Sequence, residues 1–261
     1  MTAPADLLKH IIAAKLRAHA ARSPRALDAL WAEVATQPAT RPWRDSLRVA
    51  GRLQAIAEFK RRSPSAGVIR ADADPAAIAT EYAAAGAAAL SVLTDEEFFG
   101  AELGDVGRAR QACALPVLRK DFLLDERDLL ETRLGSADAA LLIVRLFSAS
   151  QLGALVAVGK QAGLGLLVEA HTDGEVEIAL AAGAEVVGVN HRDLDTLQID
   201  LGLSARARRL AGEDIVLVAE SGLATVEDLA LMRRHRVDAV LVGESLLRAP
   251  SPGDKLRELL G

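Results

Sequence analysis

Residues 164–190 read LGLLVEAHTDGEVEIALAAGAEVVGVN, and this stretch contains a strand, a helix and a second strand in order. The apolar runs at residues 164–171 and 185–190 are nearly continuous, as in parallel strands that are covered on both faces. The alanine-rich segment between them ends at Gly183, where a glycine that terminates a helix is expected. The stretch therefore predicts one βαβ unit of a parallel sheet.

The same pattern recurs from residue 53 to the end of the chain. Helices are predicted between the apolar runs, for example after Asp74-Pro75, where proline occupies the first helical position, and after Thr225, which begins a capping box with Asp228. The apolar runs lie at residues 53–60, 89–95, 116–122, 139–147, 164–171, 185–190, 214–221 and 238–244. Eight strands that are each followed by a helix predict a closed (β/α)₈ TIM barrel. An open doubly wound sheet is the alternative fold, and the lack of a Gly-x-Gly-x-x-Gly element weakens it.

One domain accounts for the whole chain, with an N-terminal helical extension at residues 1–50 and the barrel at residues 51–261. Leu7, Ile11 and Leu16 recur at helical spacing in the extension. Two interpretations stay open for this helix. It is either a solvated leader with a connector, or a helix that covers one end of the barrel.

The composition excludes several classes of protein. The 261 residues are 51% hydrophobic and 26% charged, as in a globular protein. A net charge of −5 with 3% aromatic residues argues against a nucleic-acid surface. Apolar stretches stay far below the roughly 18 residues of a membrane span, and no export signal is visible, so we expect a cytoplasmic protein. The single cysteine, Cys113, excludes an internal disulfide framework and is expected to be a packing residue.

Charged residues stand where the predicted strands end. Glu58 and Lys60 share a strand face with Ile56, and Lys120 shares a face with Leu118. Barrel enzymes place their catalytic groups at these ends, and a buried charge costs several kcal/mol unless it is paired. The other strand ends carry Glu169, Asn190, Glu220, Ser221 and Glu244. We therefore predict one polar pocket at this rim, in which a lysine is suited to act as a general acid.

Glycines and histidines near the same rim have different expected roles. Ser221-Gly222 and Gly243 follow the seventh and eighth strands, where many barrels bind phosphate. The histidines show no metal-ligand spacing, and solvated loop positions are expected for His171 and His191. No metal or redox cofactor is therefore predicted. Arg192 is either a second anion-binding residue or a surface arginine, and Phe98-Phe99 either stacks on a flat substrate ring or packs on the barrel.

Residues 56–67, IAEFKRRSPSAG, resemble the first-strand motif of the indole-3-glycerol phosphate synthase family. Six motifs of that family occur in order in this chain. The others are LTD with FFG at residues 93–100, LRKDF at 118–122, LVE at 167–169, NHRDL at 190–194 and AESG at 219–222. Two positions depart from the family pattern: Ala101-Glu102 stands where Gly-Ser is common, and His191 where a small polar residue is common.

The resemblance implies a TIM-barrel carboxy-lyase of tryptophan biosynthesis. Such an enzyme converts 1-(2-carboxyphenylamino)-1-deoxyribulose 5-phosphate to indole-3-glycerol phosphate, with loss of carbon dioxide and water and without a cofactor. It implies that Lys120 is the general acid of ring closure and that Glu169 and Lys60 serve the dehydration, in an order that the sequence leaves open. Glu58 would orient Lys60. Asn190 and Ser221 would hold hydroxyl groups. The implied substrate-binding residues are Ser63, Phe99, Phe122, Leu141, Arg192, Gly222, Gly243 and Glu244.

Two other functions are alternatives to this one. Another phosphosugar barrel, such as phosphoribosylanthranilate isomerase, would use a carboxylate and a cysteine near the first strand, where this chain has Glu58 and Lys60. A non-catalytic phosphometabolite-binding protein would not need both Lys120 and Glu169. The expected partner is a small phosphorylated substrate, not a nucleic acid or a membrane. The oligomeric state stays open between a monomer and a weak dimer.

Overall fold

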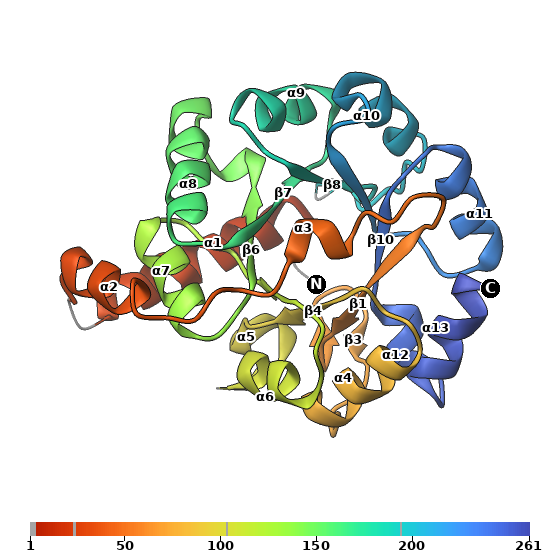
Figure 1. The fold of residues 1–261 in the computed structure, drawn as a ribbon, viewed down its shortest axis with the longest axis horizontal. Helices are drawn as coiled ribbons and strands as arrows, with labels where there is room; N and C mark the ends of the chain where they lie inside the picture. Colours follow the sequence, from red (N-terminus) through yellow and green to blue (C-terminus); the bar gives the residue numbers. More distant parts are fainter. Residues whose placement is uncertain (1–3, 23–24, 103, 194) are drawn as a thin grey trace.

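The computed structural model describes residues 4–22, 25–102, 104–193 and 195–261, and its centre is a closed barrel of eight parallel strands. The strand order is β1-β10-β9-β8-β7-β6-β5-β4, and β1 pairs with both β10 and β4 (Figure 1). The strands are β1 (Gln54–Phe59), β4 (Ala89–Leu93), β5 (Val117–Lys120), β6 (Ala139–Ile143), β7 (Gly165–Ala170), β8 (Val186–Asn190), β9 (Val216–Glu220) and β10 (Ala239–Val242). The predicted (β/α)₈ barrel is confirmed, and the open sheet is excluded.

Helices follow every strand and form the outer ring of the barrel. The predicted caps are present: the Asp74 side chain accepts from the backbone N–H groups of α4, and Thr225 and Asp228 form a capping box. The helices are α4 (Pro75–Ala84), α5 (Glu96–Phe99), α6 (Asp105–Ala112), α7 (Glu126–Leu134), the 3₁₀ helix η1 (Val144–Leu146), α8 (Ala149–Gln161), α9 (Asp173–Ala181), α10 (Leu203–Ala211), α11 (Val226–Arg234), α12 (Glu244–Arg248) and α13 (Pro252–Leu260). A small hairpin, β2 (Arg62–Ser63) with β3 (Gly67–Val68), lies in the loop after β1 and was not predicted.

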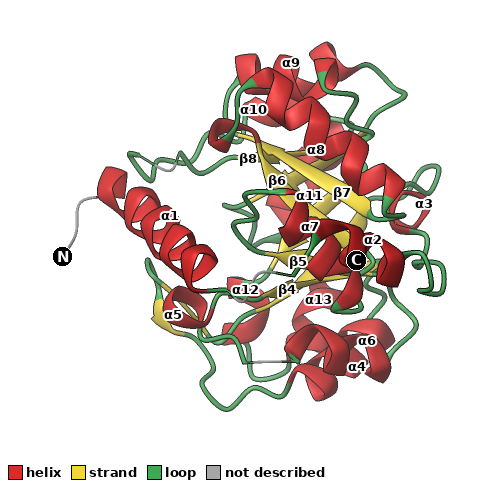
Figure 2. Ribbon diagram, turned by 90° about the vertical axis from the view of Figure 1, so that its left-hand side faces the viewer, coloured by secondary structure: helices red, strands yellow, loops and turns green. Residues whose placement is uncertain are grey.

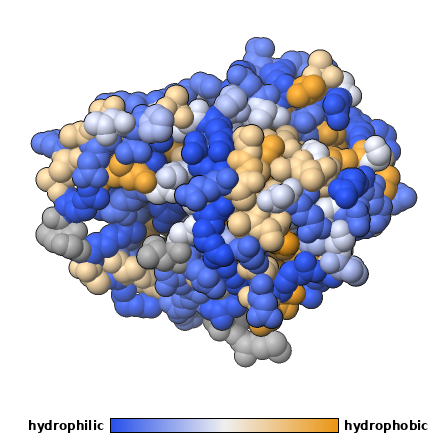
Figure 3. Space-filling view, turned by 60° about the horizontal axis from the view of Figure 1, so that its bottom comes forward, coloured by the Kyte–Doolittle hydropathy of each residue, from blue (hydrophilic) through white to orange (hydrophobic). Residues whose placement is uncertain are grey.

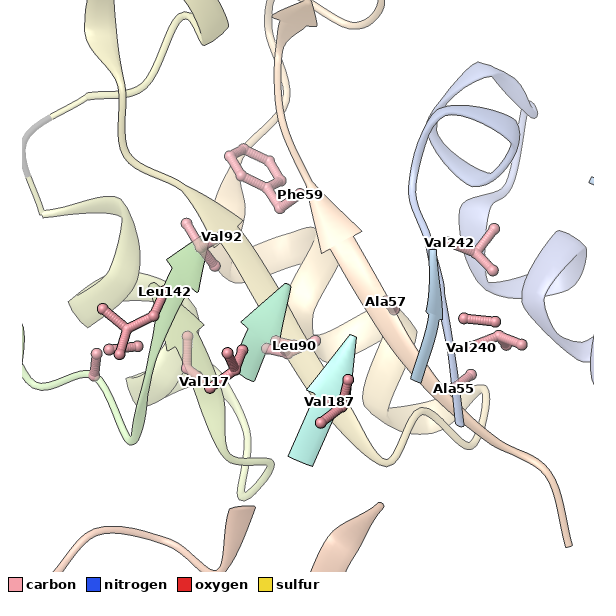
Figure 4. Close-up of a cluster of buried hydrophobic side chains, with 14 of the residues drawn as sticks. Ala55, Ala57, Phe59, Leu90, Val92, Val117, Leu142, Val187, Val240 and Val242 are labelled. Atoms are coloured by element: carbon pink, nitrogen blue, oxygen red, sulfur yellow. The ribbon is translucent and has the colours of Figure 1, made fainter. Parts of the chain in front are cut away.

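Strand side chains alternate between two apolar layers. In β1, Ala55, Ala57 and Phe59 belong to the layer between the strands and the helices, part of which Figure 4 shows. Ile56 points the other way, into the cluster that fills the barrel. Because strand side chains have a period of two, Glu58 also points into the barrel, as predicted.

The N-terminal extension reaches both ends of the barrel. Figure 2 places α1 (Pro4–Ala21) at one end and α3 (Trp43–Ser46) at the other. Trp43 and Leu47 are buried and belong to the cluster inside the barrel. The intervening α2 (Leu27–Val34) packs against α7 on the outside. Of the two interpretations of the first helix, the structure supports the one in which it covers one end of the barrel.

The face that Figure 3 shows is largely hydrophilic, with its broadest apolar area right of the centre and smaller apolar areas elsewhere. This agrees with helices that bury one face and expose a polar one. None of the described helices is both long and apolar enough to cross a membrane.

Asp138, directly before β6, closes the end of the barrel opposite α1, and we expect its loss to destabilise the fold. Its fully buried carboxylate accepts hydrogen bonds from the backbone of Arg41 and Val117 at 2.8 and 3.0 Å and pairs with Arg110 at 3.0 Å. Asp138→Ala leaves these donors unpaired, so the free energy of unfolding in urea should fall by about 3 kcal/mol. Glu213→Ala removes an exposed ion pair with Arg236 and should cost less than about 1 kcal/mol. Equal losses in the two variants would contradict this role.

Candidate active site

A cavity of about 570 Å³ opens at the end of the barrel where the strands finish. The loops after the strands and the helix α1 form its walls. All the site residues predicted from the sequence line it, namely Glu58, Lys60, Ser63, Phe99, Lys120, Phe122, Leu141, Glu169, Asn190, Arg192, Ser221, Gly222, Gly243 and Glu244. The barrel thus brings together, at one end, residues from all parts of the chain after residue 57. These residues are far apart in the sequence and come into contact only in the folded barrel.

Lys120, at the end of β5, lies between two carboxylates. Its Nζ is 2.9 Å from Oε2 of Glu169 on β7 and 3.0 Å from Oε2 of Glu220 on β9. Burial disfavours the ammonium form, but the two carboxylates outweigh burial and raise the pKa of Lys120 above its ordinary value. Lys120 is therefore protonated at neutral pH and can donate a proton to a bound molecule.

Glu169 is buried and yet ionised. Burial alone would favour its protonated form, but Lys120 and the nearby His171 hold the pKa of Glu169 well below its ordinary value. Asn190 Nδ2 donates a hydrogen bond of 3.1 Å to Oε1 of Glu169. A protonated lysine and an ionised carboxylate that line the same cavity are chemically able to donate and to accept a proton there.

The carboxylates of Glu58 and Glu220 occupy space that glycines leave open. A Cβ on Gly243 would lie 2.5 Å from Oε1 of Glu58, and a Cβ on Gly188 would lie 2.2 Å from Oε1 of Glu220. Gly243 follows β10, which pairs with β1, and Gly188 lies within β8, which pairs with β9, so a side chain at either position would displace a carboxylate. Lys60 Nζ pairs with Oε1 of Glu58, which fixes the lysine at the mouth of the cavity.

Glu220 stands at one of the strand ends that were predicted to form the pocket, but no role in the site was predicted for it. It is 2% exposed, and its Oε1 has no hydrogen-bond partner among the described residues. Burial raises the pKa of Glu220 to about 7, because the attraction of Lys120 only partly offsets burial and the charge of Glu169 adds to it. The buried carboxylate beside Lys120 makes Glu220 part of the site.

The cavity has an apolar side and a polar side. Leu93, Phe99, Phe122, Leu141 and Ile143 form an apolar wall near the strand ends, and Leu7, Leu8 and Ile11 of α1 lie above the mouth. On the other side stand Ser63, Ser221, Gly222, Gly243, Ser245 and Arg248. The α1 residues and Arg248 were not predicted to line the cavity. For α1 the reason is that helical spacing shows that a helix is amphipathic but not which surface it covers.

His171 and His191 are not solvated, so the expectation for these two residues was wrong. His171 follows β7 directly, and its side chain is fully buried between Glu169 and Glu175. His191 Nε2 lies 2.7 Å from Ser204 Oγ, and its Nδ1 lies 3.0 Å from the carbonyl oxygen of Ser221. Burial lowers the pKa of His191, which is therefore neutral. In both cases a neighbouring helix, α9 or α10, covers a position that follows a strand.

His19, Asp125 and Asp128 come close enough together to suggest metal ligands. However, Arg22 Nη1 lies 2.7 Å from Oδ1 of Asp128, and the second oxygen of Asp128 accepts the Leu124 N–H at 2.7 Å. The group therefore forms ion pairs that attach α1 to α7.

The fold is a TIM barrel, and its cavity holds a protonated lysine between buried carboxylates. Serines, glycines and an arginine line the opening of the same cavity. These features define an enzyme for acid–base chemistry on a small anionic molecule. Residues 8–259 match the family model of indole-3-glycerol phosphate synthase. The chain belongs to this family.

Curated relatives carry the same family name. The chain is 48% identical over 227 residues to indole-3-glycerol phosphate synthase 2 of Streptomyces coelicolor, covering 87% of this chain and 88% of the relative. It is 44% identical over 262 residues to the synthase of Azoarcus sp., covering 98% and 99%. Among solved structures, thiamine phosphate pyrophosphorylase from Pyrococcus furiosus has a TM-score of 0.59, covers 84% of this chain and 96% of its own, and shares 16% identity. That likeness shows the fold alone.

The burial of Glu220 predicts a pH-dependent gain in stability on Glu220→Gln. The folded protein binds the Glu220 proton up to about pH 7, whereas a carboxyl group with the ordinary value of 4.5 has lost it. Stability from this group is therefore present at pH 5 and is lost as the pH rises through 7. The variant should melt at the same temperature as the parent at pH 5 and at a higher temperature at pH 8. Glu258→Gln, at an exposed position, is the control, and an equal change at both pH values would contradict the assignment.

Lys15 attaches α1 to the barrel, and we expect its loss to loosen that helix. Lys15 Nζ lies 3.0 Å from Oδ2 of Asp95 and 2.6 Å from Oδ1 of Asp121, in the loops after β4 and β5. Lys15→Met keeps the length of the side chain but removes both ion pairs. Amide hydrogen exchange in α1, followed by mass spectrometry, should accelerate about tenfold, which corresponds to roughly 1.4 kcal/mol. Lys9→Met, at an exposed position of the same helix, should leave the exchange unchanged. Equal exchange in both variants would show that Lys15 does not hold α1.

Proposed function

We propose that this chain catalyses the closure of the pyrrole ring of indole-3-glycerol phosphate from 1-(2-carboxyphenylamino)-1-deoxyribulose 5-phosphate, as a carboxy-lyase of tryptophan biosynthesis. The observation that carries this proposal is the pairing of Lys120 with Glu169 at the floor of a cavity that has an apolar side and a polar side. The substrate matches these features because it has an aromatic ring with a carboxylate at one end and a phosphate at the other.

Lys120 is the general acid of ring closure. It donates a proton to the carbonyl oxygen of the substrate while the aromatic carbon that bears the carboxylate attacks the carbonyl carbon. A carbon–carbon bond forms, and the carbonyl becomes a hydroxyl group. The carboxylate then leaves as carbon dioxide, and its bonding electrons restore the aromatic ring. The carboxylates beside Lys120 support this role, because they keep it protonated at neutral pH.

Glu169 and Lys60 perform the dehydration that follows. Glu169 is ionised and accepts a proton from the intermediate, and Lys60 donates a proton to the hydroxyl group, which leaves as water. Glu58 orients Lys60 through their ion pair. Asn190, which is bonded to Glu169, and Ser221 at the next strand end hold the hydroxyl groups of the substrate. Positioned acids and bases of this kind contribute about 10²- to 10⁴-fold each to the rate.

The two ends of the substrate bind at the two sides of the cavity. The phosphate lies at Ser63, Gly222, Gly243 and Glu244, where backbone N–H groups of glycine-rich turns can donate to it. The aromatic ring lies against Phe99, Phe122 and Leu141, and Arg192 binds the carboxylate. Binding at both ends brings the reacting atoms together, so positioning supplies a large part of the rate.

We also propose that residues 1–261 act as one domain in the cytoplasm, where a biosynthetic enzyme meets its phosphorylated substrate. The contacts of α1 with the cavity support a single functional unit, because the extension supplies part of the wall.

The turnover assay uses the purified full-length protein and the carboxyphenylamino substrate, without an added cofactor. The fluorescence of the indole product should appear with time. Lys120→Ala removes the acid and should lower kcat by about 10²- to 10⁴-fold, while the variant still binds a phosphate-bearing product analogue in calorimetry. Lys160→Ala, at an exposed lysine on α8, is the matched control and should keep its activity.

Two results would oppose these assignments. A parent protein that binds the analogue but forms no product would support a non-catalytic phosphometabolite-binding protein. Normal turnover by Lys120→Ala would refute the role of Lys120 as the acid while leaving the reaction itself in place.

A further inference from the structure

His171 connects the cavity to a carboxylate outside it. Its Nε2 lies 3.2 Å from Oε1 of Glu169, and its Nδ1 lies 3.3 Å from Oε2 of Glu175 in the first turn of α9. The backbone N–H of His171 also donates to Oε2 of Glu175 at 2.7 Å. The imidazole is therefore held in place from its own backbone and lies between two carboxylates.

The charges around His171 alternate in sign. Glu169 faces it from β7 and Glu175 from α9, and Arg145 of η1 lies behind Glu175 with Nε 3.3 Å from Oε1. Nη1 of Arg145 in turn lies 3.8 Å from Oδ2 of Asp195, in the loop after β8. Burial and Arg145 both disfavour the charged imidazole, but the two carboxylates outweigh them and raise the pKa of His171 to about 9. His171 is thus an imidazolium at neutral pH.

An imidazolium at this position balances the charge of the site. The buried carboxylates of Glu58 and Glu169 pair with the ammonium groups of Lys60 and Lys120, and Glu220, whose pKa lies near 7, adds a further negative charge when it ionises. A buried charge without a partner is costly, and His171 supplies the cation. Glu175 and Arg145 form a second balanced pair behind it.

The contact also restricts how the Glu169 carboxylate can rotate. A terminal carboxylate torsion is broad, so a single partner does not fix its plane. Oε2 of Glu169 accepts a hydrogen bond from Lys120 and Oε1 accepts one from Asn190, and His171 Nε2 faces Oε1 at 3.2 Å as an ion-pair partner without a hydrogen bond among the described residues. Partners on both oxygens hold the plane in which Glu169 accepts a proton.

From this geometry we infer that His171 is a positioning residue of the site, held as an imidazolium by Glu175, which keeps the Glu169 carboxylate ionised and turned toward Lys120 and the cavity. The inference rests on the proposed function, in which Glu169 is the base. His171 itself does not line the cavity and acts through Glu169.

Removal of the imidazolium should change the pH profile of kcat. A cation within about 4–6 Å lowers the pKa of a carboxyl group by about 1–3 units, so its loss raises the pKa of Glu169. The fall of kcat at acidic pH (the acidic limb of the profile), which accompanies protonation of Glu169, should therefore occur at higher pH in the variant. A residue that only fills space would lower stability without moving this limb.

The variants His171→Gln and Glu175→Gln test the inference in the full-length protein with the carboxyphenylamino substrate. His171→Gln should move the acidic limb up by about 1–2 pH units and lower kcat at pH 7 more than it raises KM. Glu175→Gln lowers the pKa of His171, so a smaller fraction of His171 is protonated, and the acidic limb should move in the same direction by a smaller amount. His191→Gln is the matched control, because His191 is equally buried at the same rim but neutral, and its limb should not move.

A second measurement needs no substrate. The imidazole resonances of His171 in the parent protein, followed by NMR against pH, should titrate near 9, and in Glu175→Gln they should titrate at lower pH. If His171→Gln does not fold, Glu175→Gln decides the question by both readouts. An acidic limb that coincides with that of the parent, or a parent imidazole that titrates near 6.5, would overturn the inference. A parent protein without turnover would instead refute the proposed function, and the NMR titration would still test the imidazolium.

Discussion

The ion pairs of Lys120 with Glu169 and Glu220 are the constraint on which the site depends. Each of these groups is costly to bury as an unpaired charge, and each ion pair offsets part of that cost. The three side chains come from the alternate strands β5, β7 and β9 and meet inside the barrel, where Nζ of Lys120 contacts both carboxylates. The interaction therefore connects strands β5, β7 and β9, and a change at one of them affects the protonation of all three side chains.

The sequence predicted the barrel and the side chains inside it because both follow from short-range patterns. A period of two in β1 is enough to place Glu58 and Lys60 on the face of Ile56, and the recurrence of apolar runs and capped helices favours a closed barrel over an open sheet. Burial of His171 and His191 could not be predicted in this way. It depends on Glu175 and Ser204, which approach only when α9 and α10 pack on the strands. The covering role of α1 depends likewise on acidic residues that other βα loops place beside Lys15.

The two ends of the barrel carry different functions. At the end where the strands begin, Trp43 and Leu47 fill the interior, and Asp138 and Asp238 accept backbone N–H groups of neighbouring strands. These contacts contribute to stability and have no access to the cavity. At the other end, buried charges line the cavity, and the pKa of Glu220 near 7 indicates that its burial costs stability. Because the contacts that stabilise the barrel lie at the opposite end, the fold tolerates that cost in stability.

The helix α1 changes the strength of the interactions beneath it. Its leucines lie above the mouth of the cavity, while Lys15 holds the helix to the rim through Asp95 and Asp121. Water that an apolar roof and a bound substrate displace no longer screens the charges of Lys120 and Glu169, and charge interactions strengthen as the local dielectric falls. The same electrostatics require that the charges balance before the substrate enters, since any surplus would also go unscreened. When Glu220 ionises, the site holds three buried carboxylates and two lysines, and the imidazolium of His171 beside Glu169 then offsets the surplus negative charge.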